Sequence, residues 1–210
     1  MTVLTRRAAA LACSLVLALG GATALAANTA PRVKFSTTAG DFVVEVYPDK
    51  APKTVDNFLR YAKDHHYDGT IFHRVIDNFM IQGGGYDTKF DEKPTRPPVA
   101  HEGREAVAKG MKNVRGTIAM ARTSDPNSAT AQFFINVKDN AFLDPVPIAP
   151  GEAAAPPSAQ KLWGYTVFGK VVSGMDVIDR IKAVPTGPGG PFPSDVPRTP
   201  VVIKSAAIVK

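Results

Sequence analysis

The sequence predicts an all-β domain with two helices, in which the sheet closes into a barrel. Short stretches rich in β-branched and aromatic residues recur between Gly, Pro, Asn and Asp, a pattern typical of strands. Only two stretches space their apolar residues as a helix does. Closing such a sheet removes its exposed edges. The chain has 210 residues, 44% of them hydrophobic, which favours one globular domain with a sizeable core.

Seven stretches carry the strand pattern, and the Ala39–Asp41 junction between the first two predicts a hairpin. They are VKFST (33–37), FVVEVY (42–47), GTIFHRVI (69–76), GTIAMA (116–121), QFFINV (132–137), TVFGKVV (166–172) and VVIKSAAIV (201–209). Two segments, 94–98 and 145–158, are too rich in proline and small residues for regular structure. We expect them to be surface loops.

The two expected helices span 52–63 and 175–184. In the first, Pro52 suits the opening turn. The apolar residues of this segment recur at helical spacing, at Val55, Phe58, Leu59 and Ala62. The second segment places its apolar residues on one face, at Met175, Ile178 and Ile181.

Residues 1–26 are expected to be a secretory signal peptide, and residues 27–210 the mature domain. Arg6 and Arg7 precede an apolar run, and small residues follow before a cleavage site after Ala26. The run is shorter than the roughly 18 residues that a spanning helix needs, which disfavours a membrane anchor. The arginine pair leaves open a twin-arginine signal.

Cys13, the only cysteine, lies in this N-terminal segment. A lipid anchor there is disfavoured because Ala10 stands where a large aliphatic residue is expected. The mature chain would then have neither disulfide nor thiol chemistry. Removing the two signal arginines lowers the net charge from +6 to +4, and the remaining charges are scattered. This distribution favours a solvated surface over a nucleic-acid partner.

The familiar catalytic patterns are missing from the sequence. The four histidines, at 65, 66, 73 and 101, lack the clustered spacing of a metal site. Gly83–Gly85 is followed by no GK[ST], so we interpret it as a tight backbone turn rather than a phosphate loop. No GxSxG elbow is present to supply a hydrolase nucleophile. The sequence therefore predicts neither a metal nor a cofactor.

Two side chains in the expected strands, Phe134 and Arg74, are not explained by packing in the core. Strand alternation in QFFINV puts Phe133, Ile135 and Val137 on the core face and leaves Phe134 on the other face, between Gln132 and Asn136. Phe134 is thus either a binding-site aromatic or a scattered surface residue. Arg74 lies inside an apolar run. It is either a functional cation, a structural ion-pair partner, or a side chain whose stem packs on apolar residues while its charged head reaches water.

Three long motifs resemble the cyclophilin family of peptidyl-prolyl cis-trans isomerases, and most closely its periplasmic bacterial branch. They are FHRVIDNFMIQGGG (72–85), GTIAMARTSDPNSATAQFFINVKDNAFLD (116–144) and GYTVFGKVVSGMDVIDRI (164–181). The resemblance runs from about Val33 to Val209. It implies an eight-stranded antiparallel barrel closed at its ends by two helices.

The resemblance also implies what the protein does. A monomeric periplasmic enzyme would accelerate rotation about X-Pro peptide bonds in unfolded or folding exported proteins. It would bind neither nucleic acid nor, after signal cleavage, a membrane. The alternative is a cyclophilin-like peptide-binding or holdase module in which catalysis is incidental. Arg74 discriminates between the two, because a pure binding module could dispense with it.

By matched position, the resemblance assigns the site residues. Arg74 would be the catalytic guanidinium. The apolar pocket for the proline ring would be formed by Phe79, Met80, Phe134 and Leu143, and the peptide groove would be lined by Gln82, Ala121 and Gln132. Phe142 and Tyr165 stand where many eukaryotic members have tryptophan and histidine. Losing the indole N–H donor weakens the expectation of tight cyclosporin binding. The 145–163 connection looks extended. Trp163 either covers part of the groove or anchors this connection, and we favour anchoring.

Overall fold

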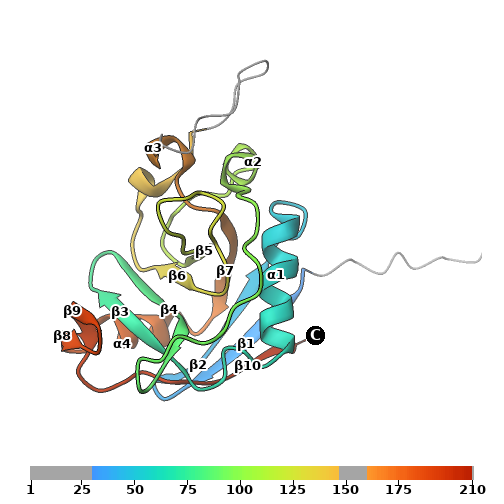
Figure 1. Ribbon diagram of the computed structural model, residues 1–210. Helices are drawn as coiled ribbons and strands as arrows, with labels where there is room; N and C mark the ends of the chain where they lie inside the picture. The colour runs from blue at the N-terminus through green and yellow to red at the C-terminus, as the bar shows by residue number, and fades with distance from the viewer. Residues whose placement is uncertain (1–29, 147–159, 210) are drawn as a thin grey trace, which may run out of the picture.

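One antiparallel sheet of eight strands dominates the computed structural model, which describes residues 30–146 and 160–209 (Figure 1). The strand order is β10-β1-β2-β7-β5-β6-β4-β3. The strands are β1 (Arg32–Thr37), β2 (Gly40–Val46), β3 (Thr70–Ile76), β4 (Met80–Asp87), β5 (Thr117–Met120), β6 (Phe133–Asn136), β7 (Val167–Ser173) and β10 (Ile203–Val209). All seven stretches expected to be strands are confirmed, and β1 and β2 form the expected hairpin.

The sheet is a half-barrel that stays open between its edge strands β3 and β10, so the expectation of a closed barrel was wrong. In the described part of the chain the two edges meet at one isolated bridge, Ile71–Val202. Beside the bridge, the backbone N–H of Phe72 donates to the carbonyl of Val201 at 3.0 Å. A continuous ladder is interrupted because β3 shifts register on both sides of Phe72 and because Pro200 has no N–H to donate.

The expected helices are present as α1 (Pro52–Lys63) and α4 (Met175–Lys182), the second ending two residues early. In Figure 1 α1 lies to the right of the strands and α4 at their lower left, near β3, and the buried faces of both belong to one core cluster. The sequence analysis missed the short helices α2 (Gly103–Ala108) and α3 (Gln160–Trp163) and the 3₁₀ turn η1 (Ala141–Leu143). With six, four and three residues, these elements are too short to show a helical period.

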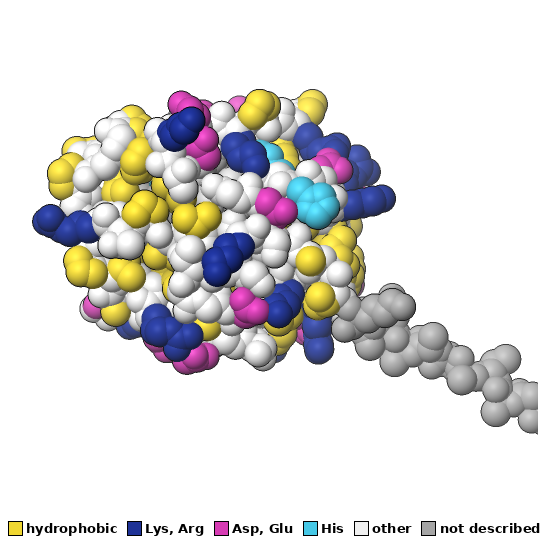
Figure 2. All heavy atoms as spheres, turned by 90° about the horizontal axis from the view of Figure 1, so that it is seen from below, with side chains coloured by type: hydrophobic (Ala, Val, Ile, Leu, Met, Phe, Trp, Pro, Cys, Tyr) yellow, Lys and Arg dark blue, Asp and Glu magenta, His cyan; other side chains and the backbone are white. Residues whose placement is uncertain are grey.

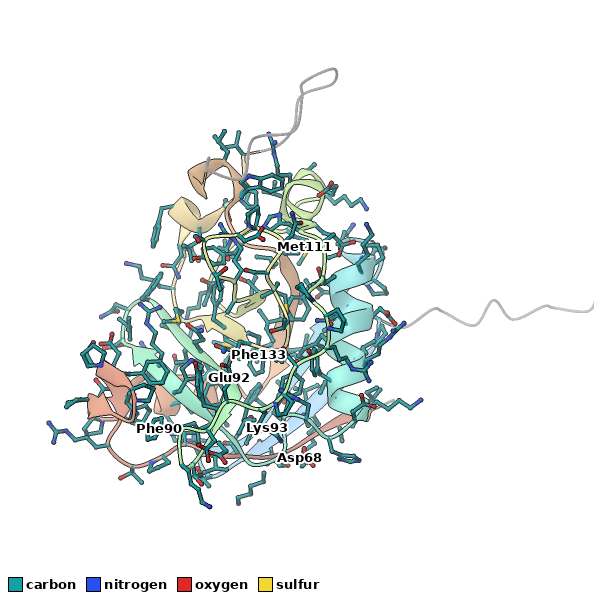
Figure 3. All side chains as sticks on the ribbon, viewed as in Figure 1. Asp68, Phe90, Glu92, Lys93, Met111 and Phe133 are labelled. Carbon is teal, nitrogen blue, oxygen red and sulfur yellow. The ribbon has the colours of Figure 1, made fainter. Side chains whose placement is uncertain are left out.

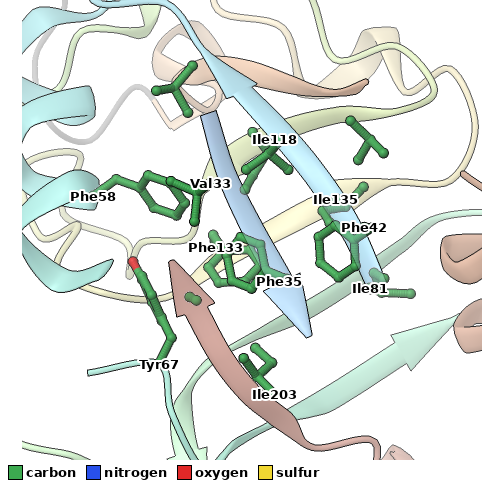
Figure 4. Close-up of a cluster of buried hydrophobic side chains, with 14 of the residues drawn as sticks. Val33, Phe35, Phe42, Phe58, Tyr67, Ile81, Ile118, Phe133, Ile135 and Ile203 are labelled. Atoms are coloured by element: carbon green, nitrogen blue, oxygen red, sulfur yellow. The ribbon is translucent and has the colours of Figure 1, made fainter. Parts of the chain in front are cut away.

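Aromatic rings from the sheet and from α1 interlock in the core. Phe35 stacks on Phe42 with ring centroids 4.9 Å apart and lies 5.4 Å from Phe133. Phe58 of α1 reaches Phe168 of β7 at 5.0 Å. Figure 4 shows these side chains from β1, β2, β6 and α1 converging between the strands and the helix. Each is almost fully buried, so this cluster makes a large contribution to the hydrophobic free energy of folding.

The glycine run forms part of β4, so its interpretation as a tight turn was wrong. A Cβ on Gly83 would lie 3.0 Å from the carbonyl oxygen of Ile71, and one on Gly85 would lie 2.5 Å from the side chain of Gln132. Gly84 also has a φ of +88°, which L side chains rarely adopt. Neighbouring groups occupy the space of side chains here, so this strand carries few of the residues that mark strands in a sequence.

A Pro- and Gly-rich hairpin, β8 (Thr186–Gly189) and β9 (Phe192–Pro197), was also missed. It packs against β3 and covers a buried histidine. His73 is 2% exposed, stacks on Phe192 at 5.3 Å and meets Tyr86 edge-on at 4.8 Å. Desolvation, and then the nearby charge of Arg74, lower the pKa of His73 to about 4. The hairpin therefore depends on a neutral imidazole.

The outer surface agrees with the expected scatter of charges. Figure 2 shows one face on which Lys and Arg side chains lie interspersed with Asp and Glu. The loop 94–98 is exposed and irregular, as expected. The signal segment 1–26 and residues 147–158 of the second expected loop lie outside the described residues. Of the helices that the structure describes, none has the length and apolar character needed to cross a membrane.

The N-terminus of α1 is capped by a side chain that lies far away in sequence. Its own N-cap residue, Ala51, offers no side-chain acceptor. The Glu102 carboxylate accepts instead from the backbone N–H of Lys53 at 3.0 Å and from the N–H and hydroxyl of Thr54, both at 2.8 Å. Glu102 is only 7% exposed, so its charge is balanced mainly by these donors and by the helix dipole.

Glu102→Ala is expected to lower the free energy of unfolding by about 2 kcal/mol, because it leaves the α1 donors buried and unpaired. Urea unfolding monitored by circular dichroism measures this loss. Glu105→Ala, at an exposed position of α2, serves as the matched control and should change stability little. Equal effects of the two substitutions would contradict the capping role.

The stability of the fold is expected to decrease as the pH falls from about 6.5 to about 4. In this window the unfolded chain binds a proton at His73 that the folded chain excludes. The same holds for His101. Burial, and secondarily the charge of Arg122, lower the pKa of His101 to about 4. For His73 alone the change between pH 7 and pH 5 amounts to about 2 kcal/mol.

Urea unfolding at several pH values between 5 and 7 tests this dependence. His73→Phe should flatten the pH slope, while a substitution of the exposed His65, His65→Gln, should leave it unchanged. A slope in His73→Phe as steep as that of the unaltered chain would show that His73 does not take up the proton on unfolding.

Candidate functional site

The register of the sheet brings three predicted site residues into one row. Arg74 of β3 pairs with Gln82 of β4, and Gln82 pairs with Phe134 of β6. Directly paired residues in antiparallel strands project from the same face. Because Phe133 and Ile135 occupy the interior face of β6, this row projects from the outer face of the half-barrel.

A cavity of about 220 Å³ opens on this face beside the row. Eight of the ten predicted site residues line it, and Arg122, which the sequence analysis did not single out, lines it as well. The lining consists of Arg74, Phe79, Met80, Gln82, Ala121, Arg122, Phe134, Leu143 and Tyr165.

The floor of the cavity is a second apolar cluster, separate from the main core. Met80 and Phe134 are 2% and 4% exposed, and they pack with the buried Ala119 and Val167. Tyr165 meets the Phe134 ring edge-on at 5.3 Å. Phe134 is therefore a cavity residue rather than a scattered surface apolar residue. The floor is closed to water from below, as a binding site for a small apolar ring requires.

Arg74 stands exposed at the rim of this cavity. Within residues 30–146 and 160–209, its guanidinium makes no side-chain hydrogen bond and no ion pair. The alternative that Arg74 serves as a structural ion-pair partner is therefore wrong. Its donors remain free to meet a ligand in the cavity.

Gln132 lies outside the cavity, in a neighbouring hollow of about 160 Å³. Its side-chain oxygen accepts a hydrogen bond from Gln82 Nε2 at 3.0 Å, which links the two hollows. Glu92 contributes an acidic group to this second hollow. It forms an isolated bridge with Tyr86 of β4 and lies near that strand in Figure 3. A peptide that occupies the cavity can continue along this groove.

Phe142 lies on the other side, in a third hollow of about 470 Å³. Its ring is 71% exposed and stacks on Phe79, with centroids 5.7 Å apart. The predicted site residues thus lie in three adjoining hollows rather than in one. Trp163 packs edge-on against His101 at 5.3 Å, a contact that fits the predicted anchoring role.

Buried asparagines hold two walls of the cavity in place. Asn140 Nδ2 donates to the carbonyl of Phe79 and to the side-chain oxygen of Asn136, both at 2.8 Å. Asn136 donates to Asn113 at 3.2 Å, and Asn113 donates to Asp144 at the end of η1. All three asparagines are fully buried, so the network fixes the Phe79 wall relative to the η1 wall.

Arg122 is the main site residue that the sequence analysis missed, since it lines all three hollows. It directly follows Ala121 at the end of a predicted strand, and this position beside an expected groove residue was the available signal. Within the described part of the chain, no group of three or more His, Cys, Asp or Glu residues is arranged to hold a metal ion.

Comparison with known proteins identifies this arrangement. A family model described as cyclophilin type peptidyl-prolyl cis-trans isomerase/CLD matches residues 32–208. A peptidyl-prolyl cis-trans isomerase of Streptomyces antibioticus is 51% identical over 177 residues, which cover 84% of this chain and 98% of the relative. Peptidyl-prolyl cis-trans isomerase B of Escherichia coli K12 is 49% identical over 176 residues, with the same coverage.

Solved structures show the same fold. A cyclophilin-type isomerase of Cryptosporidium parvum superposes with a TM-score of 0.64 at 23% identity, over 86% of this chain and 98% of that one. The chain has an apolar cavity with a guanidinium at its rim, and it matches this family model and these relatives. It therefore belongs to the cyclophilin-type peptidyl-prolyl cis-trans isomerases and catalyses rotation about X-Pro bonds.

Proposed function

We propose that the cavity binds the ring of a substrate proline and that Arg74 is the catalytic group. The observation that carries this assignment is a guanidinium without a side-chain partner in the described chain, at the rim of a closed apolar floor. Gln82, Ala121 and Gln132 hold the flanking peptide in the groove. A C. parvum cyclophilin has been solved in the presence of the dipeptide Ala-Pro, which supports a proline-containing ligand for this site.

The chemistry requires no covalent step. Rotation is slow because the nitrogen lone pair is delocalised into the carbonyl, which produces a barrier of roughly 18–20 kcal/mol. In the twisted state the lone pair returns to the nitrogen, which can then accept a hydrogen bond. A guanidinium suits this role because it stays charged and presents its N–H donors in a rigid fork.

The apolar floor makes that hydrogen bond effective. Met80 and Phe134 hold the proline ring while the carbonyl side turns, and they exclude water from one side of the bond. An interaction made only in the twisted state lowers the barrier without tightening ground-state binding. Acceleration from tens of seconds to milliseconds requires about 5–6 kcal/mol, at roughly 1.4 kcal/mol per decade. One charged donor, together with desolvation and positioning of the peptide, can supply a barrier reduction of that size.

Arg74→Ala is expected to lower kcat/KM for an X-Pro peptide by about 100-fold or more, because it removes the donor to the twisted nitrogen. The kcat/KM of Arg74→Lys should fall between those of the unaltered chain and Arg74→Ala, because the lysine ammonium is a point charge without the planar fork. Exchange between cis and trans peptide, followed by NMR, measures the rates. Arg60→Ala is the control, since Arg60 lies on α1 and pairs with Asp56.

The same experiment separates catalysis from simple peptide binding. In the proposed mechanism Arg74→Ala binds the peptide with little change while its turnover collapses, with the fold checked by circular dichroism. An Arg74→Ala protein that isomerises as fast as the Arg60→Ala control would favour the alternative of a binding or holdase module in which catalysis is incidental.

We further propose that the protein acts in the periplasm, as a monomer, on proline-containing segments of folding exported proteins. Support comes from the sequence, where Arg6 and Arg7, the apolar run and the small residues before Ala27 form a signal pattern, and where residues 27–210 contain no cysteine. In this proposal residues 27–210 are the mature domain, which keeps no membrane segment and needs no nucleic acid.

Expression of the full chain in a Gram-negative bacterium tests the export proposal. The protein is expected in the periplasmic fraction with Ala27 as its first residue, as read by intact-mass measurement and N-terminal sequencing. A chain that keeps residues 1–26 and stays in the cytoplasm would contradict it.

A further inference from the structure

His73 is an extra residue in β3, directly before Arg74. Phe72 pairs with Gly83 of β4. Arg74, two residues further along, pairs with Gln82, so β3 advances two residues while β4 advances one. Such a two-against-one step is a β-bulge. Bulges are common beside active sites, where they change the direction of a side chain. The residue that this bulge leaves without a partner in the β3–β4 ladder is His73.

The bulge decides which face of the sheet Arg74 occupies. Phe72 and Val75 both belong to the main core cluster, although they are three residues apart. In a regular strand, side chains three residues apart lie on opposite faces. The extra residue lets both side chains reach the core and leaves Arg74 on the outer face. Without the bulge, Arg74 would share the interior face with Phe72.

The direction of Arg74 depends on this stretch of backbone, because no other side chain orients its head group. Throughout residues 30–146 and 160–209, the guanidinium makes no side-chain hydrogen bond and no ion pair. Its position at the rim of the cavity is therefore set by the conformation of β3. A bulge disrupts the ladder locally, so packing of side chains has to fix that conformation.

Four rings, here called the ring cluster, pack around the bulge: His73, Tyr86, Phe90 and Phe192. The His73 ring is 2% exposed, stacks on Phe192 at 5.3 Å and meets Tyr86 edge-on at 4.8 Å. Phe192 meets Tyr86 edge-on at 5.2 Å and lies 6.3 Å from Phe90. None of these four residues belongs to the main core cluster or to the floor of the cavity.

The β8–β9 hairpin supplies the outer ring of this cluster. The hairpin lies beside β3 at the lower left of Figure 1, and Phe192 is the first residue of β9. Its turn packs on Phe90, because a Cβ at Gly189 would lie 3.2 Å from the Phe90 ring and one at Gly190 would collide with that ring. The hairpin contributes none of the residues that line the three hollows. It is connected to Arg74 through Phe192 and His73.

We propose that His73 and Phe192 are positioning residues for the isomerisation, and that the β8–β9 hairpin holds the bulge so that Arg74 points over the proline cavity. Neither residue lines the cavity, so both act through Arg74 rather than on the substrate. This inference rests on the proposed role of Arg74 as the catalytic group. Because the Arg74 donor is needed in the twisted state alone, a misdirected guanidinium lowers kcat and leaves peptide binding little changed.

Phe192→Ala tests the proposal by removing the ring that joins the hairpin to His73. We expect kcat for an X-Pro peptide to fall by about tenfold while the peptide Kd changes by less than about twofold, since a small displacement of a catalytic group is costly. NMR measures cis/trans exchange and, by titration, the Kd. Tyr47→Ala is the matched control, because it removes a half-buried ring that lines none of the three hollows. The control should keep the kcat of the unaltered chain.

Substitutions of His73 test whether packing of a ring is what holds the bulge. His73→Phe keeps a ring in the cluster and should keep kcat within about twofold, whereas His73→Ala should lose about as much as Phe192→Ala. Circular dichroism checks that each variant is folded. Phe192 lies outside the main core cluster, so the Phe192→Ala measurement stands even if His73→Ala does not fold.

A double-mutant cycle separates positioning from a general loss of structure. If the hairpin acts through Arg74, Phe192→Ala should lower the turnover of the unaltered chain and have almost no further effect in the Arg74→Ala background. A merely structural effect would lower both turnovers by the same factor, because independent effects add as free energies.

Three results would overturn the positioning role: an unchanged kcat in Phe192→Ala, an equal loss in the Arg74→Ala background, or a His73→Phe protein as impaired as Phe192→Ala. An Arg74→Ala protein that isomerises as fast as the unaltered chain would refute the proposed catalytic group, and this inference with it. Turnover that depends on Arg74 but not on Phe192 would refute the positioning role alone.

Discussion

The pairing of β3, β4 and β6 is the constraint on which the site depends. The register sets Arg74 opposite Gln82 and Gln82 opposite Phe134, so all three project from one face. A slip of β3 by one residue would turn Arg74 towards the aromatic core, and a slip of β6 by one residue would do the same to Phe134. The glycines of β4 maintain this pairing, because a Cβ at Gly83 or Gly85 would collide with β3 or with Gln132. A strand with three consecutive glycines thus positions this row.

A sheet with apolar residues on both faces explains how one small domain contains both a core and a pocket. On β6, Phe133 and Ile135 complete the main core while Phe134 contributes to the outer cluster. The outer cluster is too small to close by itself, and partly buried residues outside the sheet, such as Leu143 of η1 and Tyr165, complete its walls. The buried asparagine network ties these loops to the strands, so the pocket is rigid before a substrate arrives.

Periodicity and alternation predicted the parts of the fold that carry strong side-chain patterns. The seven strands and both longer helices were recovered, and alternation separated Phe134 from its core neighbours. The same reasoning failed where side chains are small or absent, as in β4 and in the β8–β9 hairpin. It also could not foresee the open seam between β3 and β10, which depends on bulges and on the missing N–H of Pro200. The site residues were predicted from the family resemblance. Arg122 could be recognised as a site residue only from the three-dimensional structure, in which it lies beside Gly164 and Tyr165.

The proposed mechanism requires the Arg74 guanidinium to meet the prolyl nitrogen as the bond twists. A crystal structure of residues 27–210 with a bound X-Pro peptide would test it most directly, through the distance from the nearest Arg74 nitrogen to the prolyl nitrogen. With the proline ring on Met80 and Phe134, the account predicts a distance of about 3 Å, or one that a side-chain rotation brings there. A ring seated in the cavity with Arg74 turned away, and with neighbouring atoms blocking its return, would contradict the account.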